Sequence, residues 1–282
     1  MSNWFSNSFR QWRRRWIYAL ISLLVASGLI LTTPQPGQAV SIFDLILRGV
    51  QIIQLSTLSD RQEVALGRQI NDQLVSRELN LHSDRNVNNY INAIGQRLVP
   101  YSDRSDIPYT FQVVEDSKIN AFATMGGYVY VTTGLIRAAD NEAQLASVIS
   151  HEIGHIASQH AIEQMRESAL AQGLVSAAGL DRNTAVNLGV ELALRRPNSR
   201  RDEFEADQRG LTTLTAAGYA PGAMVDFMRK LQNQPSVPAF LSTHPAVSDR
   251  IRALSQTIDP ATANSGDGLD PASYRAQISS IR

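Results

Sequence analysis

The stretch His151-Glu152-Ile153-Gly154-His155 decides the fold. Two histidines four residues apart on a helix lie on one face, one turn apart, so both imidazoles can reach a single metal ion. Glu152 projects beside them, where a carboxylate acts as a base toward water on the metal rather than as a ligand. The alternative is a solvated helix face with incidental histidines. It is disfavoured because the flanking residues are apolar, and unsatisfied polar groups in an apolar helix are costly. These flanking residues are Leu145, Val148, Ile149 and Ile156.

The helix that carries this motif is predicted to begin at Asn141 and to run through His160. Asn141 and Gln144 have the spacing of a capping box. His160 follows His155 by five residues, which places it about 140° around the helix. We therefore expect His160 to form a structural hydrogen bond and not to serve as the third ligand.

The third metal ligand is expected from a second helix. A catalytic zinc takes three protein ligands and leaves one position open. In the segment Glu203-Phe204-Glu205-Ala206-Asp207, the first and last acids share a helix face. We expect Glu203 to bind the metal and Asp207 to orient a ligand histidine. Ala206 and Gly210, one turn apart, would let this helix approach another closely. Taken alone, two acids at this spacing also fit a solvated helix face.

The rest of the chain predicts a mixed fold. Apolar residues at helical spacing indicate helices over 60–79 and 87–98, and residues rich in β-branched and aromatic types indicate strands over 109–114 and 128–132. Gly126-Gly127 supplies a turn before the second strand. The Ala- and Gly-rich stretch 169–190 fits either a helical pair or a mobile flap.

Composition limits the classes of function. The 282 residues carry 26 basic and 26 acidic side chains, so we expect no nucleic-acid partner. Cysteine is absent, which excludes a disulfide scaffold and thiol catalysis. An apolar fraction of 43% with 18% charged residues suits a chain with a substantial core.

The first 39 residues resemble a leader. Arg10, Arg13, Arg14 and Arg15 precede an apolar run over 16–31, and small residues end the segment. This order is typical of a signal peptide, with an uncleaved N-terminal anchor as the alternative. The run is shorter than the roughly 20 residues of a spanning helix, which favours cleavage. Both interpretations predict an exported protein, periplasmic or membrane-associated on the non-cytoplasmic side. We expect a zinc metallopeptidase domain over 40–257 and a polar, poorly ordered C-terminal tail over 258–282.

Four motifs together resemble a known family. Taken from roughly Glu63 to Arg252, the chain resembles the HtpX and CAAX-prenyl-protease peptidases, which are gluzincins, and is most similar to their periplasmic LoiP/BepA-type branch. Met125 stands where that family has a proline, which affects only the local turn. The motifs are Asn120-Ala121-Phe122-Ala123 with Gly126 to Leu135, His151 to His155, Glu203 to Asp207, and Ser242-Thr243-His244-Pro245 with Arg250.

The resemblance implies an α+β fold: a mainly helical gluzincin-type metalloprotease domain with a small β-sheet whose edge strand flanks the HExxH helix. It also implies one Zn²⁺ per chain. It assigns the edge strand to Gly127–Thr132, where extended polypeptide adds as an antiparallel partner; an ordinary core strand is the alternative. The substrate-binding residues that it implies are Asn120, Ala121, Gly127, Tyr128, Val129, Tyr130 and Arg250.

The same resemblance implies roles around the metal. His244 either stabilises the oxyanion as a catalytic residue or ligates zinc in a closed, resting form, and Arg250 either holds the His244 loop or contacts substrate. The implied activity is that of a metalloendopeptidase with Glu152 as general base, acting in quality control on unfolded or misassembled envelope proteins. Association with the membrane or with outer-membrane assembly machinery follows as an expectation. The alternatives are an envelope chaperone that keeps the metal fold and a zinc hydrolase of cell-wall peptides.

Overall fold

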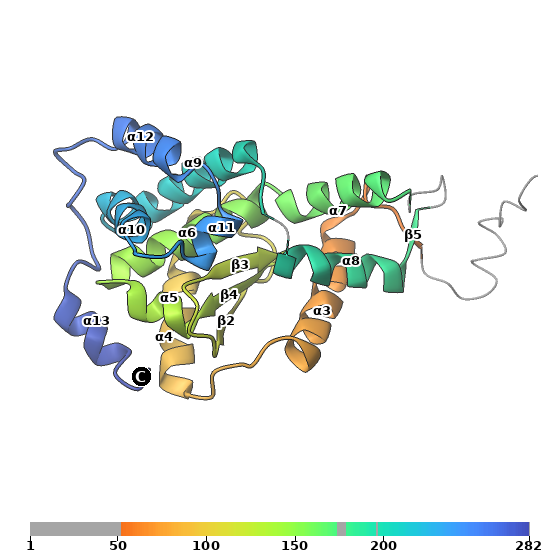
Figure 1. Ribbon diagram of the computed structural model, residues 1–282, viewed down its shortest axis with the longest axis horizontal. Helices are drawn as coiled ribbons and strands as arrows, with labels where there is room; N and C mark the ends of the chain where they lie inside the picture. The colour runs from red at the N-terminus through yellow and green to blue at the C-terminus, as the bar shows by residue number, and fades with distance from the viewer. Residues whose placement is uncertain (1–51, 174–178, 196, 282) are drawn as a thin grey trace, which may run out of the picture. The chain divides into compact units, whose positions relative to one another are not determined.

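The computed structural model describes residues 52–173, 179–195 and 197–281 (Figure 1). The chain divides into two compact units, Met1–Gly49 and Val50–Arg282, and every described residue belongs to the second. The predicted leader, with both of its interpretations, lies outside the described residues. Within them, no helix combines the length and the apolar character needed to cross a membrane.

Helices make up most of the second unit, and a small three-stranded mixed sheet accompanies them, as the fold class predicted, together with a separate antiparallel pair of β1 and β5. The strands are β1 (Ile52–Ile53), β2 (Thr110–Val114), β3 (Ala121–Thr124), β4 (Tyr128–Thr132) and β5 (Leu180–Asp181). The helices of the first half are α3 (Asp60–Arg77), α4 (Arg85–Leu98), the 3₁₀ turn η1 (Val99–Tyr101), α5 (Thr133–Ala138) and α6 (Glu142–Ala157). Those of the second half are α7 (His160–Ala171), α8 (Arg182–Arg195), α9 (Arg200–Ala216), α10 (Gly222–Gln232), α11 (Ala239–Thr243), α12 (Val247–Thr257) and α13 (Pro271–Gln277).

The strand order corrects the predicted edge strand. The three-stranded sheet has the order β2-β4-β3, with β4 parallel to β2 and antiparallel to β3. The segment Gly127–Thr132 therefore supplies the central strand, and β3 forms the edge that flanks α6. Glycines 126 and 127, with φ of +77° and +91°, form a tight turn, so β3 pairs directly with β4. Because β2 pairs with the other side of β4, β3 is left at the edge of the sheet. The backbone of Tyr128, Val129 and Tyr130 is already paired on both sides, which leaves no free edge there for an added strand.

Helices α6 and α9 touch backbone to backbone. A Cβ added at Gly154 of α6 would lie 2.6 Å from the carbonyl oxygen of Ala206 in α9. One added at Gly210 of α9 would lie 3.0 Å from the backbone nitrogen of His151. The structure thus confirms the close approach that Ala206 and Gly210 predicted, and it places the partner glycine inside the HExxH motif.

Helix α6 is shorter than predicted. It ends at Ala157, and Gln159 adopts a left-handed conformation with φ of 56° before α7 begins at His160. The side-chain amide of Gln159 donates to the carboxylate of Glu63 at 3.1 Å, which holds the turn against α3. Because the chain bends at Gln159, His160 leaves the axis of α6, and its Nδ1 lies 2.8 Å from Nδ1 of His155.

The C-terminal segment is packed, so the expectation of a poorly ordered tail is wrong. Tyr274 of α13 is 1% exposed, and its hydroxyl donates to the carbonyl oxygen of Ile136 at 2.6 Å. The backbone N–H of Ala143 donates to the carbonyl of Gly268 at 2.9 Å, which ties this segment to the start of α6. In the stretch 169–190, the described residues fit the helical-pair alternative, formed by α7 and α8.

The α6–α9 contact predicts a large effect for a small substitution. We expect Gly154→Ala to lower the free energy of unfolding by about 1–3 kcal/mol, because the new methyl meets backbone atoms that cannot turn away. Urea denaturation followed by circular dichroism measures the change. The control is Gln208→Ala on the exposed side of α9, expected within about 0.5 kcal/mol of the unmodified protein. Equal stability of the two variants would contradict the tight contact.

Candidate metal centre

The predicted ligands converge in the core of the fold. Donor atoms of His151, His155, Glu203 and His244 all lie within 4.8 Å of one another, and all four side chains are buried. Helix α6 supplies the first two, α9 supplies Glu203, and the residue that follows α11 supplies His244. Helix α9 and the residue after α11, both distant in sequence, thus meet at the HExxH motif. The prediction that Glu203 is the third ligand requires this proximity of α9.

The spacing of the three predicted ligands fits a tetrahedral ion. The two Nε2 atoms of His151 and His155 are 3.1 Å apart. The carboxylate oxygens of Glu203 lie 3.3 Å from Nε2 of His155 and 3.6 Å from Nε2 of His151. Ligands about 2.0–2.1 Å from a central ion form tetrahedral edges of about 3.3 Å. The three side chains therefore outline one face of a metal site.

The hydrogen bonds behind the imidazoles orient lone pairs toward this site. Nδ1 of His151 lies 2.9 Å from Oδ1 of Asp207, and Nδ1 of His155 lies 2.8 Å from Nδ1 of His160. Nε2 of His160 in turn lies 3.6 Å from the carboxylate of Glu205. In the tautomers that bind a metal through Nε2, Nδ1 of His151 and of His155 carries the proton and donates it to Asp207 and to His160, so both Nε2 atoms then face each other without one. Two unshared pairs 3.1 Å apart repel, and a cation between them removes that repulsion. The predicted roles of Asp207 and His160 fit this geometry.

Arg250 holds the acidic residues in place. Its guanidinium is 1% exposed and donates to both carboxylate oxygens of Asp207, at 2.6 and 2.7 Å. It also donates to Glu203 and, at 3.4 Å, to the backbone carbonyl of His244. All of these contacts are internal, so the geometry fits the alternative in which Arg250 holds the His244 loop, and the buried side chain offers no surface to a substrate.

Asn198 is a residue that the sequence reasoning missed. Its side-chain amide donates to Glu203 at 2.8 Å and lies 3.3 Å from Nε2 of His155. Gln164 of α7 donates to the amide oxygen of Asn198 at 2.7 Å. In the sequence, Asn198 stands between Pro197 and the N-cap Ser199, where a polar residue is explained by the start of the helix. No local pattern distinguishes it.

Glu152 and His244 form a second pair beside the ligands. Nε2 of His244 lies 3.3 Å from Oε1 of Glu152, and Nδ1 of His244 lies 2.9 Å from the carbonyl of Phe240. Both side chains are buried. His244 therefore directs Nε2 at the carboxylate of Glu152, beside the three predicted ligands. Its position is compatible with both roles predicted for it.

Burial and the local charges set the protonation states. Burial, together with the charge of Arg250, lowers the pKa of His151 to about 4, so this imidazole is neutral near pH 7 and free to bind a metal. Burial opposes ionisation of Glu203, but the neighbouring charges of His244 and Arg250 outweigh it and lower the pKa of Glu203. Burial likewise opposes ionisation of Asp207, and the hydrogen bonds from Arg250 lower its pKa. The site thus combines a neutral imidazole at His151 with the ionised carboxylates of Glu203 and Asp207, which suits a divalent cation.

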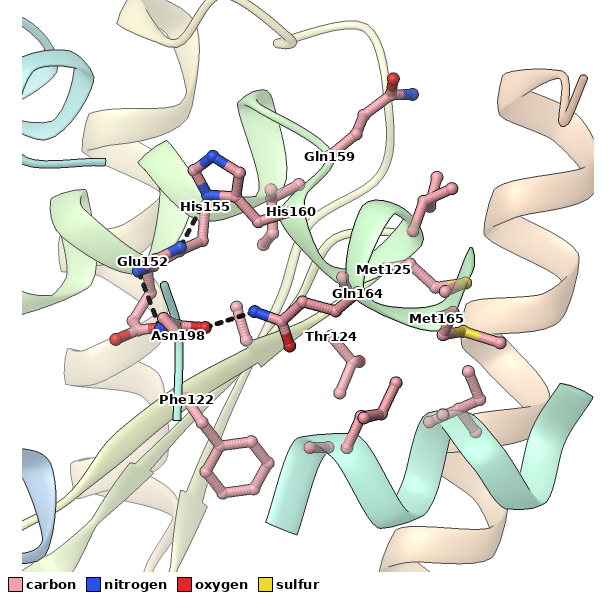
Figure 2. Close-up of a pocket in the computed structure, with 18 of the residues that line it drawn as sticks. Phe122, Thr124, Met125, Glu152, His155, Gln159, His160, Gln164, Met165 and Asn198 are labelled. Carbon is pink, nitrogen blue, oxygen red and sulfur yellow. Dashed lines mark hydrogen bonds between the residues drawn. The ribbon is translucent and has the colours of Figure 1, made fainter. Parts of the chain in front are cut away.

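A pocket opens from this centre along the edge strand. Figure 2 shows Glu152, His155 and Asn198 at one end of it and Met125 and Met165 at the other. Asn120, immediately before β3, also lines it, while its backbone N–H donates to the hydroxyl of Thr132 at 3.1 Å. Of the predicted substrate contacts on this side, Asn120 therefore lines the pocket beside the metal centre, whereas Ala121, the first residue of β3, is 0% exposed and does not line it. Those at Gly127, Tyr128, Val129 and Tyr130 lie in the adjoining turn and central strand.

Comparison with known proteins identifies a family and several relatives that this sequence resembles. The sequence matches Peptidase family M48 over residues 85–258. It is 34% identical over 213 residues to the Beta-barrel assembly-enhancing protease of Escherichia coli (strain K12), covering 70% of this chain and 44% of that protein. It is 29% identical over 179 residues to the Mitochondrial metalloendopeptidase OMA1 of Schizosaccharomyces pombe, covering 61% of this chain and 53% of that protein. The chain thus spans about half the length of these relatives.

The contact between Asp207 and His151 predicts a change in metal affinity. We expect Asp207→Asn to weaken metal binding about 10- to 100-fold, because the partner that orients His151 loses its charge. Competition with a chromophoric chelator measures the affinity. Asp226→Asn, at an exposed carboxylate on α10, is the control and is expected to bind as the unmodified protein does. Unchanged affinity in Asp207→Asn would show that Asp207 does not support the ligand.

Proposed function

Because the chain belongs to Peptidase family M48, we propose that it is a zinc-dependent metalloendopeptidase. The observation that carries this proposal is the tetrahedral spacing of His151, His155 and Glu203 beside the carboxylate of Glu152. Imidazole and carboxylate ligands at tetrahedral positions are typical of zinc. One Zn²⁺ per chain accounts for the three donors.

The residues of the chain divide the chemistry between them. A zinc ion held there supplies a Lewis acid that makes water acidic and polarises a peptide carbonyl. Glu152 is placed to accept the proton of the attacking water and to pass it to the amine that leaves. Burial opposes ionisation of Glu152, yet the neighbouring His244 lowers its pKa, so the carboxylate is ready to act as a base near neutral pH.

His244 has two places in this scheme. The donor atom of His244 lies within 4.8 Å of those of His151, His155 and Glu203, so in a closed form His244 would be a fourth ligand to a bound zinc ion. In an open form it would instead donate to the oxygen that becomes negative in the tetrahedral intermediate. Burial lowers the proton affinity of His244, but the charges of Glu203 and Glu152 outweigh burial and raise its pKa, which suits a donor.

The substrate is proposed to be extended polypeptide. β3 is an edge strand of its sheet and runs beside the metal centre, so a substrate strand can add to it through backbone hydrogen bonds that accept many sequences. The name of the Escherichia coli relative refers to β-barrel assembly. Together with the leader-like sequence, this supports a protein exported to the periplasm or to the non-cytoplasmic side of a membrane. There it would cleave unfolded or misassembled envelope proteins, beside the assembly machinery of the outer membrane.

Replacing the proposed base tests the enzyme directly. We expect Glu152→Gln to lower the rate of casein hydrolysis about 10²- to 10⁴-fold, because the amide cannot accept the proton, while one equivalent of zinc stays bound. Gel electrophoresis follows the digestion, and elemental analysis measures the metal. Removing zinc with a chelator is expected to stop hydrolysis, and adding it back to restore it.

The control for this test is Glu163→Gln, a carboxylate on α7 that pairs with Arg201 at the surface. It is expected to digest casein at the unmodified rate. If Glu152→Gln and Glu163→Gln digest casein equally well, the protein is not a peptidase that uses Glu152. That result would favour the alternative function, an assembly factor that retains the metal fold.

A further inference from the structure

The start of α9 brings the side chain of Asn198 to a predicted metal ligand. Ser199 is the N-cap of this helix, so Asn198 occupies the position before the cap and Glu203 is the fourth residue of the helix. Side chains at these two positions pack against each other at many helix starts, usually as two apolar groups. Here both are polar, and the helix start joins a hydrogen-bond donor to a metal ligand.

The side-chain amide of Asn198 reaches two of the three predicted ligands. Its Nδ2 donates to Oε1 of Glu203 at 2.8 Å and lies 3.3 Å from Nε2 of His155. Oε1 of Glu203 is itself 3.3 Å from the same Nε2 atom. The three atoms therefore form a small triangle, and a rotation of the Glu203 carboxylate would break its contact with Asn198.

The two carboxylate oxygens of Glu203 have different donors. Oε2 accepts from the guanidinium of Arg250, whereas Oε1 accepts from the neutral amide of Asn198. Glu203 is 0% exposed, so bulk water cannot replace either donor. With Arg250 alone, the carboxylate could turn about a single contact. Asn198 supplies the second contact, which fixes the plane of the carboxylate.

The amide of Asn198 is itself held in one orientation. Gln164 of α7 donates to its Oδ1 at 2.7 Å (Figure 2). The backbone N–H of Asn198 donates to the carbonyl of Thr243, at the end of α11, at 3.0 Å. Because an ionised carboxylate only accepts hydrogen bonds, the amide presents its nitrogen to Glu203 and its oxygen to Gln164. Both the backbone and the side chain of Asn198 are therefore anchored.

We propose that Asn198 is a positioning residue that fixes the Glu203 carboxylate toward a bound metal ion, and that Gln164 holds Asn198 in turn. The inference rests on the proposed function and adds two residues, neither of them a ligand, to those that set the affinity for the metal. Removing the hydrogen-bond partner of a metal ligand typically weakens metal binding about 10- to 100-fold. Asn198 gives this support without adding a charge to the site.

The first experiment measures the zinc affinity of the full chain by competition with a chromophoric chelator. We expect Asn198→Ala to weaken zinc binding about tenfold or more, because Oε1 of Glu203 loses its donor. The matched control is Ser199→Ala, which removes the N-cap hydrogen bond to the backbone N–H of Asp202 at the exposed start of the same helix. It is expected to lower the midpoint of urea denaturation and to bind zinc as the unmodified protein does.

Cobalt in place of zinc gives a readout that a loss of stability alone would not change. The visible absorption of bound Co²⁺ depends on the arrangement of its ligands. At full occupancy, we expect Asn198→Ala to alter this spectrum and Ser199→Ala to leave it as it is. If the two variants have the same spectrum and the same zinc affinity, Asn198 does not position Glu203, although zinc binding and casein hydrolysis by the unmodified protein would still support the proposed function. An unmodified protein that binds no zinc would overturn both.

A double-mutant cycle tests the part assigned to Gln164. We expect Gln164→Ala alone to weaken zinc binding, but less than Asn198→Ala does, because the amide keeps its backbone anchor. In the Asn198→Ala protein, Gln164→Ala is expected to cause no further loss, since its effect passes through the amide that is already removed. Equal losses in the two backgrounds would show that Gln164 does not act through Asn198.

Discussion

Three electron-rich atoms held in one buried place are the constraint on which the rest of the structure depends. The Nε2 atoms of His151 and His155 and the carboxylate of Glu203 are 3.1 to 3.6 Å apart. Burial removes the water that would otherwise separate such groups, so their repulsion is balanced only by a cation. Around them, Arg250 and Asn198 donate hydrogen bonds that hold the carboxylate at this distance without filling the centre. The core of the fold and the metal site are therefore built from the same residues.

The packing of α6 on α9 makes this spacing possible. Gly154 lies between the two ligand histidines in sequence and faces the backbone of Ala206, while Gly210 faces the backbone of His151. A glutamate side chain is short. The backbone of α9 must therefore lie close to α6 if the carboxylate of Glu203 is to bind the same ion as the two imidazoles. A single methyl group between the helices would separate the backbones by more than the tolerance of a metal–ligand bond, about 0.2 Å. The glycine inside the motif is thus part of the metal site, although it offers no ligand.

The sequence predicted most where the geometry is local. Helical spacing is rigid, so the positions of His151 and His155 on one face, and of Glu203 and Asp207 on another, followed from their numbers alone. The order of strands depends on pairing between distant segments, and periodicity could not show that β3, rather than Gly127–Thr132, forms the edge. The left-handed residue Gln159 has no sequence signal of its own, so α6 was expected to continue past it.

The proposed substrate strand depends on the same packing as the metal centre. β3 forms the edge of the three-stranded sheet and packs against α6, so the strand proposed to pair with extended polypeptide lies next to the helix that carries His151 and His155. Backbone pairing at such an edge would accept many sequences, because it uses no side chain of the substrate. The contact between β3 and α6 therefore links the proposed recognition of a polypeptide to the residues that would hold the metal, and a change in that contact is expected to affect both.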